Sequence, residues 1–308
     1  MAPNTSNLFS NRNILLAHLS AFICIVMWGV SFVSTKVLHN NGMQPVEIYI
    51  YRFTLAYLLI ILFKRGKLLS HNWRDEGLLC LCGILAGSIY FLAENFALQY
   101  TLVSNVSLLT ATSPLLTAIL IGLMIKSDRP GRGMITGMCV AFVGVGCIIF
   151  NSSFNIEIKR LGDILAMMAA LSWALYSIVL KKLNATYDVW FISRKTFFYG
   201  VLTALPFLLV EPPHYNIPDI WANKAVLGNL LFLGIGASMI CYVLWAIAVG
   251  KLGAVTANNY LYIQPIITLI FSVICLDENV SAIGYVGCGL ILTGLWLGDH
   301  LSRRQSLK

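Results

Sequence analysis

Ten long apolar runs divide this sequence, and they constrain its fold more than any other feature. A helix needs about twenty apolar residues to cross the hydrocarbon core of a bilayer. Runs near that length recur along the whole chain, with mostly short polar connections between them. The runs are 14–36, 46–63, 77–98, 103–125, 133–150, 162–180, 191–210, 226–249, 254–276 and 281–299. We therefore predict an all-α membrane protein with ten transmembrane helices.

The composition supports this prediction, because the chain has too few charged residues for a soluble fold. Hydrophobic residues make up 58% of the 308 residues and charged residues 11%, whereas a soluble domain has roughly 25% charged residues. The first run is longer than the apolar region of a signal peptide, so we predict a retained first helix. The eight cysteines lie in apolar runs, where cysteine acts as a small apolar residue. We expect no metal or other cofactor.

Lysines and arginines are distributed unevenly between the two sides of the predicted bundle. Sixteen of the 21 lie on the side that carries the N-terminus, and four lie on the opposite side. Cytoplasmic loops of membrane proteins carry such an excess of positive charge. We therefore expect both termini in the cytoplasm. The same topology accounts for the net charge of +8, so we expect no nucleic-acid partner.

The two halves of the sequence are similar to each other. A shift of 145 residues places Trp28 on Trp173, and a shift of 151 places Pro114 on Pro265. Because each copy holds five spans, an odd number, the second copy enters the membrane from the opposite face. Inverted repeats of this kind are typical of secondary transporters. The expected parts are an N-terminal tail (1–13), a first repeat (14–150), a connecting loop (151–161), a second repeat (162–299) and a C-terminal tail (300–308).

Several segments resemble the two EamA repeats of the drug/metabolite transporter superfamily. The segments that resemble the first repeat are WGVSFVSTKVL (28–38) and ALQYTLVSNVSLLTATSPLLTAIL (97–120). The segments that resemble the second repeat are GDILAMMAALSWALYSIVLKKL (162–183) and AVGKLGAVTANNYLYIQPIITLIFSVICLDENVS (248–281). The resemblance implies a ten-helix fold in which the first four helices of each half line a central cavity. It places the fifth and tenth helices at the periphery.

The same resemblance implies a class of activity. Transporters of this superfamily move amino acids and other small metabolites or drugs, often outward, and some relatives move sugar-nucleotides or phosphorylated sugars. The sequence departs from the family pattern in one place. The acidic residue after the proline helix is Glu278 in the second half, whereas the first half has Lys126-Ser127-Asp128 there.

Two prolines lie in the middle of predicted helices at matching repeat positions, Pro114 in the fourth and Pro265 in the ninth. Proline removes a backbone hydrogen bond and bends a helix. In a membrane, the freed carbonyl groups are tolerated where they face protein or a wet cavity. The prolines are therefore candidates for a pair of hinges, and static packing kinks are the alternative.

Arg52 and Glu94 are charged residues within predicted spans, both in the outer third of the membrane by the charge-based orientation. Charges at such depth are costly and commonly functional. Glu94 is a candidate ligand for a substrate ammonium group or for a coupling proton. The alternative is a structural ion pair between the two side chains. The second repeat has Trp245 where the first has Glu94, so the halves differ here.

Aromatic and hydroxyl side chains recur at helical spacing along the predicted spans. Trp28, Ser31 and Thr35, for example, share one face of the first helix. As a set we expect such residues to line a substrate cavity, although each one singly fits a contact between helices equally well. The predicted cavity residues are Trp28, Ser31, Thr35, Arg52, Tyr90, Glu94, Thr110, Ser113, Trp173, Tyr176, Ser238, Tyr242, Trp245, Asn258, Tyr262 and Gln264.

Glycines of the fifth and tenth predicted helices have the spacing of close helix contacts. Gly133 and Gly137 lie four residues apart, as do Gly294 and Gly298. Small residues at this spacing let two helix backbones approach each other. We favour packing within one chain, and a homodimer contact is the alternative.

These features predict a secondary transporter that moves, and by family resemblance exports, a small metabolite such as an amino acid by alternating access. One acid and one base among aromatic residues suit a zwitterion. A membrane-embedded enzyme is the main rival, but the histidines show no metal-ligand spacing and no catalytic motif is present. Exchange of sugar-nucleotides or phosphorylated sugars is a second rival. The compact loops favour a bacterial inner membrane, with a small-molecule substrate and the lipid bilayer as partners.

Overall fold

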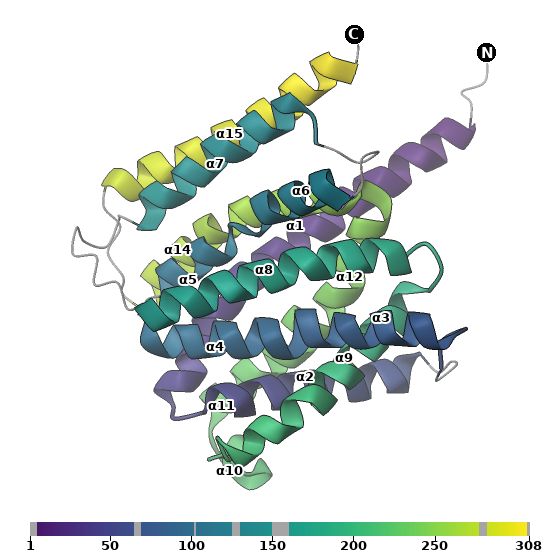
Figure 1. Cartoon of the computed structure of the whole chain (residues 1–308). Helices are drawn as coiled ribbons and strands as arrows, with labels where there is room; N and C mark the ends of the chain where they lie inside the picture. The colour runs from purple at the N-terminus through teal and green to yellow at the C-terminus, as the bar shows by residue number, and fades with distance from the viewer. Residues whose placement is uncertain are drawn as a thin grey trace.

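The computed structural model describes residues 5–64, 69–101, 103–124, 130–149, 160–276 and 282–306, and Figure 1 shows their arrangement. These residues form helices and contain no β-strand, which confirms the predicted all-α class for this part of the chain. The start of the first helix and the end of the last lie toward the same end of the molecule (Figure 1). The residues singled out at 126–128, Glu278 and most of the connecting loop 151–161 lie outside the described ranges.

The first half of the chain contains seven labelled helices within the described ranges. They are α1 (Thr5–Asn40), α2 (Pro45–Phe63), α3 (Trp73–Gly83), α4 (Tyr90–Tyr100), α5 (Val103–Thr110), α6 (Ser113–Met124) and α7 (Arg132–Ile149). A π-helix, Ile84–Ile89, joins α3 and α4 into one continuous segment.

The second half contains α8 (Arg160–Leu183), α9 (Val189–Ala204), α10 (Ile217–Ala222), α11 (Lys224–Leu231), α12 (Cys241–Leu252), α13 (Ala254–Asn259), α14 (Gln264–Leu276) and α15 (Ala282–Ser306). A π-helix, Phe232–Ile240, joins α11 and α12. Short 3₁₀ helices follow α9 (Leu205–Leu209) and join α13 to α14 (Tyr260–Ile263).

Local signals account for several helix boundaries. α2 begins at Pro45, whose fixed φ suits the first helical position. The Gln44 backbone N–H donates to the Glu47 carboxylate at 3.1 Å, which caps this helix start. The side chain of Asn72 accepts from the Asp75 N–H at 2.8 Å and caps α3 in the same way. α12 stops at Gly253, whose φ of +81° is a conformation that favours glycine.

Six described helical segments are long and apolar enough to cross a membrane. They are Asn13–Asn40, Pro45–Phe63, Trp73–Tyr100, Leu161–Leu183, Lys224–Leu252 and Ala254–Cys275. Three shorter apolar helices are Ser113–Met124, Arg132–Gly144 and Ala282–Gly298. These nine segments fall on nine of the ten predicted spans. The remaining span, 191–210, overlaps α9, which carries the adjacent charged residues Arg194 and Lys195.

The two π-helices lie at corresponding places in the two halves, and each offers backbone carbonyl groups to the other half. A π-helix disturbs the usual hydrogen-bond ladder and leaves groups for other partners. In the first half, the Ala86 carbonyl accepts from the Tyr242 hydroxyl, and the Leu85 carbonyl accepts from Ser172 at 2.6 Å. In the second half, the Ala237 carbonyl accepts from Trp28 Nε1 at 2.8 Å. These bonds join the two halves near the centre of the molecule.

Both proline helices are interrupted just before the proline. The predicted fourth span divides into α5 and α6 at residues 111–112, before Pro114. In the predicted ninth span, α-helical geometry gives way to the 3₁₀ helix Tyr260–Ile263 before Pro265. The shift of 151 residues that aligns the prolines also aligns these interruptions. The cause is common to both, because proline cannot donate its backbone hydrogen bond to the preceding turn.

Helices α7 and α15 pack against each other along their glycines and form a pair at one side of the bundle (Figure 1). A Cβ atom added at Gly137 would lie 2.5 Å from the Gly294 carbonyl oxygen and from the Gly298 Cα. A Cβ atom at Gly144 would lie 2.7 Å from the Gly287 carbonyl oxygen. The glycines therefore serve packing within the chain, as the sequence analysis favours, and Figure 1 shows this pair at the periphery that the resemblance implies.

Candidate functional site

A small cavity lies where helices from both halves meet, and we call it the central cavity. Its volume is about 20 Å³, enough for about one water molecule. Eight of its eleven lining residues belong to the predicted set. The lining consists of Trp28, Ser31, Phe32, Tyr90, Phe91, Glu94, Thr110, Ser113, Trp173, Leu261 and Gln264.

Three tryptophans form one aromatic cluster at this cavity. The ring of Trp28 lies 5.1 Å from that of Trp173 and 5.0 Å from that of Trp245, between ring centroids. Trp28 and Trp173 occupy matching positions of the two halves, so equivalent helices contact each other through equivalent residues. The Trp173 indole donates to Asn258 Oδ1 at 3.1 Å, whereas the buried Trp245 indole has no hydrogen-bond partner. The cluster gives the cavity an aromatic wall, and behind this wall the Trp245 indole N–H remains available to donate a hydrogen bond.

Glu94 supplies the carboxylate of the central cavity. It lies on α4, and only 2% of its surface is exposed. Tyr90, one helical turn earlier, hydrogen-bonds to it and lines the same cavity. A buried carboxylate beside aromatic rings is suited to bind a cationic group, because the carboxylate supplies the opposite charge and the ring faces also attract a cation.

Arg52 lies behind the cavity wall and is fully buried. Its Nε donates to the Ser238 hydroxyl at 3.0 Å, and its guanidinium carbon lies 4.4 Å from the centroid of the Phe91 ring. Both terminal nitrogens lack a hydrogen-bond partner. Arg52 and Glu94 therefore do not form the structural ion pair considered as an alternative, although their charges are close enough to interact. The two terminal nitrogens of the guanidinium retain their N–H donors for an anionic group.

The hydroxyl groups of the lining donate to nearby backbone carbonyls. Ser31 donates to the Trp28 carbonyl at 2.8 Å, Thr110 to the Val106 carbonyl at 2.9 Å, and Ser113 to the Thr110 carbonyl at 2.7 Å. A hydroxyl that donates in this way keeps lone pairs free to accept. Thr110 and Ser113 also flank the interruption between α5 and α6. These groups can accept hydrogen bonds from a ligand without leaving their own partners.

Eight predicted residues do not line the central cavity and instead build its surroundings. Arg52 and Ser238 bond to each other, the rings of Tyr176 and Tyr242 contact each other at a tilted angle in the aromatic core, and Asn258 accepts a hydrogen bond from Trp173. Thr35 is buried with an unpartnered hydroxyl. The other two are Trp245, in the tryptophan cluster, and Tyr262, whose fully buried ring packs in a separate cluster beside α7.

Three lining residues escape the sequence analysis, namely Phe32, Phe91 and Leu261. Phe32 and Phe91 are aromatic but have no polar side-chain atom, and an apolar residue in an apolar span does not differ from its neighbours in the sequence. Phe91 matters most, because its ring faces the cavity while Arg52 packs against it.

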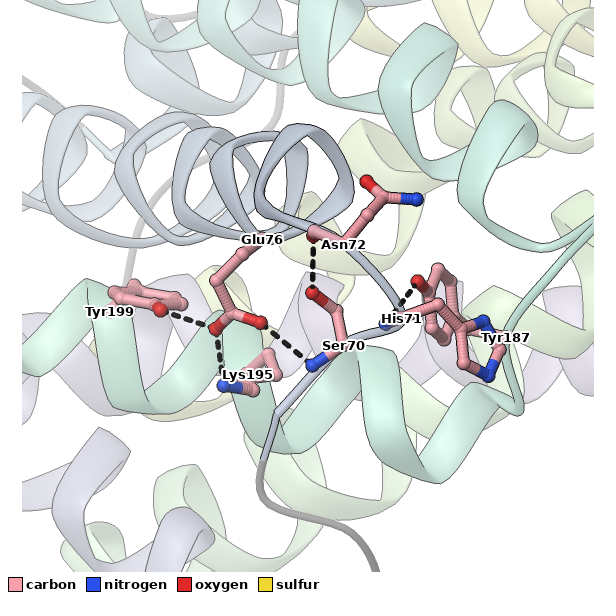
Figure 2. Close-up of polar contacts among 7 residues, drawn as sticks. All are labelled: Ser70, His71, Asn72, Glu76, Tyr187, Lys195 and Tyr199. Atoms are coloured by element: carbon pink, nitrogen blue, oxygen red, sulfur yellow. Dashed lines mark hydrogen bonds and ion pairs between the residues drawn. The ribbon is translucent and has the colours of Figure 1, made fainter.

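A second buried polar cluster connects α3 and α9, as Figure 2 shows. The Glu76 carboxylate accepts from Lys195 Nζ, from the Tyr199 hydroxyl and, at 2.9 Å, from the Ser70 N–H. Nearby, the Tyr187 hydroxyl accepts from the His71 N–H at 2.9 Å (Figure 2). The two charged side chains are 8–9% exposed. This cluster therefore ties the first half to the second near the end that carries the termini.

This ion pair is not predicted above, because Lys195 is one of the sixteen basic residues assigned to the side of the N-terminus. Two signals were available. Arg194 and Lys195 stand inside the predicted span 191–210, and Glu76 precedes the span 77–98 by one residue. Within the described ranges, no group of three or more histidine, cysteine or acidic side chains is placed to hold a metal ion.

Comparison with known proteins gives a consistent result. The model of the EamA-like transporter family matches residues 15–150 and again residues 160–297. An uncharacterised transporter of Archaeoglobus fulgidus is 26% identical over 91% of this chain and 96% of its own. A protein of Escherichia coli K12 named a probable amino-acid metabolite efflux pump is 25% identical over 90% of this chain and 92% of its own.

A solved structure supports the fold alone. This crystal structure of a protein is 18% identical in sequence, with a TM-score of 0.74, and the match covers 94% of this chain and 98% of that one. The likeness extends over nearly the whole of both chains, so the helix arrangement of Figure 1 recurs in a solved protein.

Proposed function

Because the chain belongs to the EamA-like transporter family and is a multi-pass integral membrane protein, we propose that it exports a small amino-acid-like metabolite by alternating access. The main support is the central cavity, where Glu94, aromatic rings and hydroxyl acceptors meet at the contact between the two halves. Transport sites between repeats are typical of secondary transporters. The name of the Escherichia coli relative supports the choice of substrate class.

The proposed architecture is ten transmembrane helices in two inverted repeats. Three observations support it: the family model matches the chain twice, the π-helices and proline interruptions lie at corresponding positions, and both ends of the described chain lie toward one end of the molecule. An even number of crossings brings both termini to one side. The excess of basic residues makes that side the cytoplasm, and we place the protein in a bacterial inner membrane.

In this mechanism the two ends of a zwitterion are held by different groups. The ammonium group pairs with Glu94, and the aromatic cluster covers the apolar side chain. The carboxylate pairs with Arg52 once Phe91 moves aside, since the guanidinium has two unpartnered nitrogens directly behind that ring. The cavity of about 20 Å³ is too small for an amino acid, so binding requires the helices around it to separate.

Glu94→Gln tests this assignment. Purified protein is reconstituted in liposomes loaded with an unlabelled L-amino acid, and entry of the same tritiated amino acid is followed for each of the twenty. We expect the substitution to lower the counterflow rate of the preferred amino acid by about tenfold or more, because an amide keeps the volume but loses the charge that binds the ammonium group.

Asp219→Asn in the exposed segment after α9 is the matched control and should transport like the parent protein. A Glu94→Gln variant with unchanged rate, half-saturating concentration and pH dependence would remove Glu94 from substrate binding and from proton coupling. No counterflow of any amino acid by the parent protein would reject the proposed substrate class.

We assign Pro114 and Pro265 the role of paired hinges, since each follows an interruption that leaves the chain locally less constrained. Pro114→Ala and Pro265→Ala should each change the counterflow rate several-fold and leave the half-saturating concentration within about twofold, because a restored helical bond alters motion more than the binding surface. Counterflow rates of the two variants at several substrate concentrations separate the effects. Unchanged rates in both would mean that the prolines only bend their helices.

A further inference from the structure

A second cavity lies beside the central one and is far larger. Its volume is about 330 Å³, against about 20 Å³ for the central cavity. Binding pockets for small molecules begin at roughly 300 Å³. It is lined by residues of α1, α7, α13, the following 3₁₀ helix and α15, namely His18, Met134, Thr256, Asn259, Tyr260, Ile263 and Leu295.

The chemistry of this second cavity is neutral and amphiphilic. Met134, Ile263 and Leu295 form an apolar wall, and none of the seven lining residues is acidic, lysine or arginine. On the polar side, His18 Nδ1 lies 2.7 Å from the Tyr260 hydroxyl. Asn259 Oδ1 is buried without a hydrogen-bond partner. Asn259 lines the cavity while its Oδ1 is covered, so a rotation of the carboxamide is needed to present this acceptor to a donor group in the cavity.

One short element separates the two cavities. Leu261 and Gln264 face the central cavity, whereas Asn259, Tyr260 and Ile263 face the second. The partition is thus the 3₁₀ helix Tyr260–Ile263 with its neighbours, immediately before Pro265. A 3₁₀ stretch inside a longer helix commonly marks a hinge, because its hydrogen bonds are weaker than those of an α-helix. A change in this turn alters the wall of both cavities at once.

We propose that the second cavity is an entry site, where the transported amphiphile binds before it passes the 3₁₀ partition into the central cavity. Its amine or hydroxyl group donates to Asn259 Oδ1, and its apolar part lies against Met134, Ile263 and Leu295. This inference rests on the proposed export of an amino-acid-like metabolite.

Asn259→Leu is the decisive variant. It keeps a similar volume and removes the unpartnered acceptor, so a purely structural role predicts equal or higher thermal stability and unchanged transport. An entry site predicts equal or higher melting temperature together with a half-saturating concentration raised about fivefold. The probe is the tritiated amino acid with the highest counterflow in the parent protein. An unchanged half-saturating concentration overturns the inference, whatever the other variants do.

Thr256→Trp tests the same site by filling it, and Gly122→Trp is the matched control. Gly122 lines an apolar cavity of about 270 Å³ between α6 and α7, where an added Cβ meets open space. We expect Thr256→Trp to lower counterflow more than tenfold, with Gly122→Trp keeping at least half of the parent rate. Equal rates in the two variants contradict the inference.

The two failures are distinguishable. Suppose that the parent protein transports an amino acid, that Glu94→Gln abolishes this transport and that Asn259→Leu has no effect. The proposed role of the central cavity is then supported, and the proposed entry site is rejected. If the parent protein transports none of the twenty amino acids, the proposed function is rejected, and the entry site that rests on it is rejected as well.

Discussion

Arg52→Met is expected to make the protein more stable and nearly inactive. Arg52 is 1% exposed, and its two terminal nitrogens have no hydrogen-bond partner. Replacing this charge by an apolar side chain of similar length removes the cost of burying a guanidinium whose terminal nitrogens are unbonded. Counterflow should fall about 100-fold, because the variant lacks the cation that pairs with the substrate carboxylate. Melting temperature in detergent and counterflow in liposomes give the two values.

Arg52→Lys separates charge from geometry. Lysine keeps the positive charge but cannot form the paired hydrogen bonds that a guanidinium makes with a carboxylate. We therefore expect an intermediate transport rate and a melting temperature close to that of the parent protein. A less stable Arg52→Met variant with parental transport would show that Arg52 serves the structure, through Ser238 and Phe91, and has no part in binding.

Gly294→Leu is expected to disrupt the contact between α7 and α15. A Cβ atom at Gly294 would already lie 2.6 Å from the Gly137 carbonyl oxygen and 2.9 Å from the Ala141 Cα. These neighbours are backbone atoms, so the strain cannot be relieved by a side-chain rotation. Overpacking of this kind costs about 1–3 kcal/mol and sometimes more, and a leucine exceeds the added Cβ by three carbons. Thermal unfolding in detergent should show the loss as a lower melting temperature.

Gly289→Leu is the matched control on the same helix. A Cβ atom at Gly289 meets nothing within 4 Å, so leucine should be accepted there. Both substitutions replace glycine in a helix and raise helix propensity equally, and only the packing differs. Equal melting temperatures for the two variants would show that the α7–α15 contact contributes little to stability.

The helices are well predicted from the sequence because a lipid environment permits few backbone conformations. A chain in hydrocarbon must satisfy its backbone hydrogen bonds internally, so an apolar run of sufficient length indicates a helix with little ambiguity. The distortions inside the helices were harder to predict. Pro114 and Pro265 signal the interruptions near them, whereas nothing in ILAGSI (84–89) or FLGIGASMI (232–240) signals a π-helix. A π-helix depends on partners from other helices, such as Tyr242 for the Ala86 carbonyl.

The candidate site was predictable in part for a similar reason. Trp28, Tyr90 and Glu94 are large or charged residues in apolar spans, and the central cavity includes all three. Periodicity gives the face of one helix but not the distance between two helices. It therefore left open whether Arg52 pairs with Glu94, and the structure inserts Phe91 beside the guanidinium instead. The Glu76–Lys195 pair was missed because Glu76 lies just before one predicted span and Lys195 in the first turns of another, and charges near the ends of spans are common.

The contact between α7 and α15 has a consequence for motion. At Gly137, Gly294 and Gly298 the two helices meet backbone to backbone, and no long side chain stands between them that could change its conformation as they slide. The last helix of the first half, α7, is therefore held in fixed contact with the last helix of the second half, α15. Rearrangement between the halves has to be absorbed elsewhere, in the interrupted and π-helical segments of the interior.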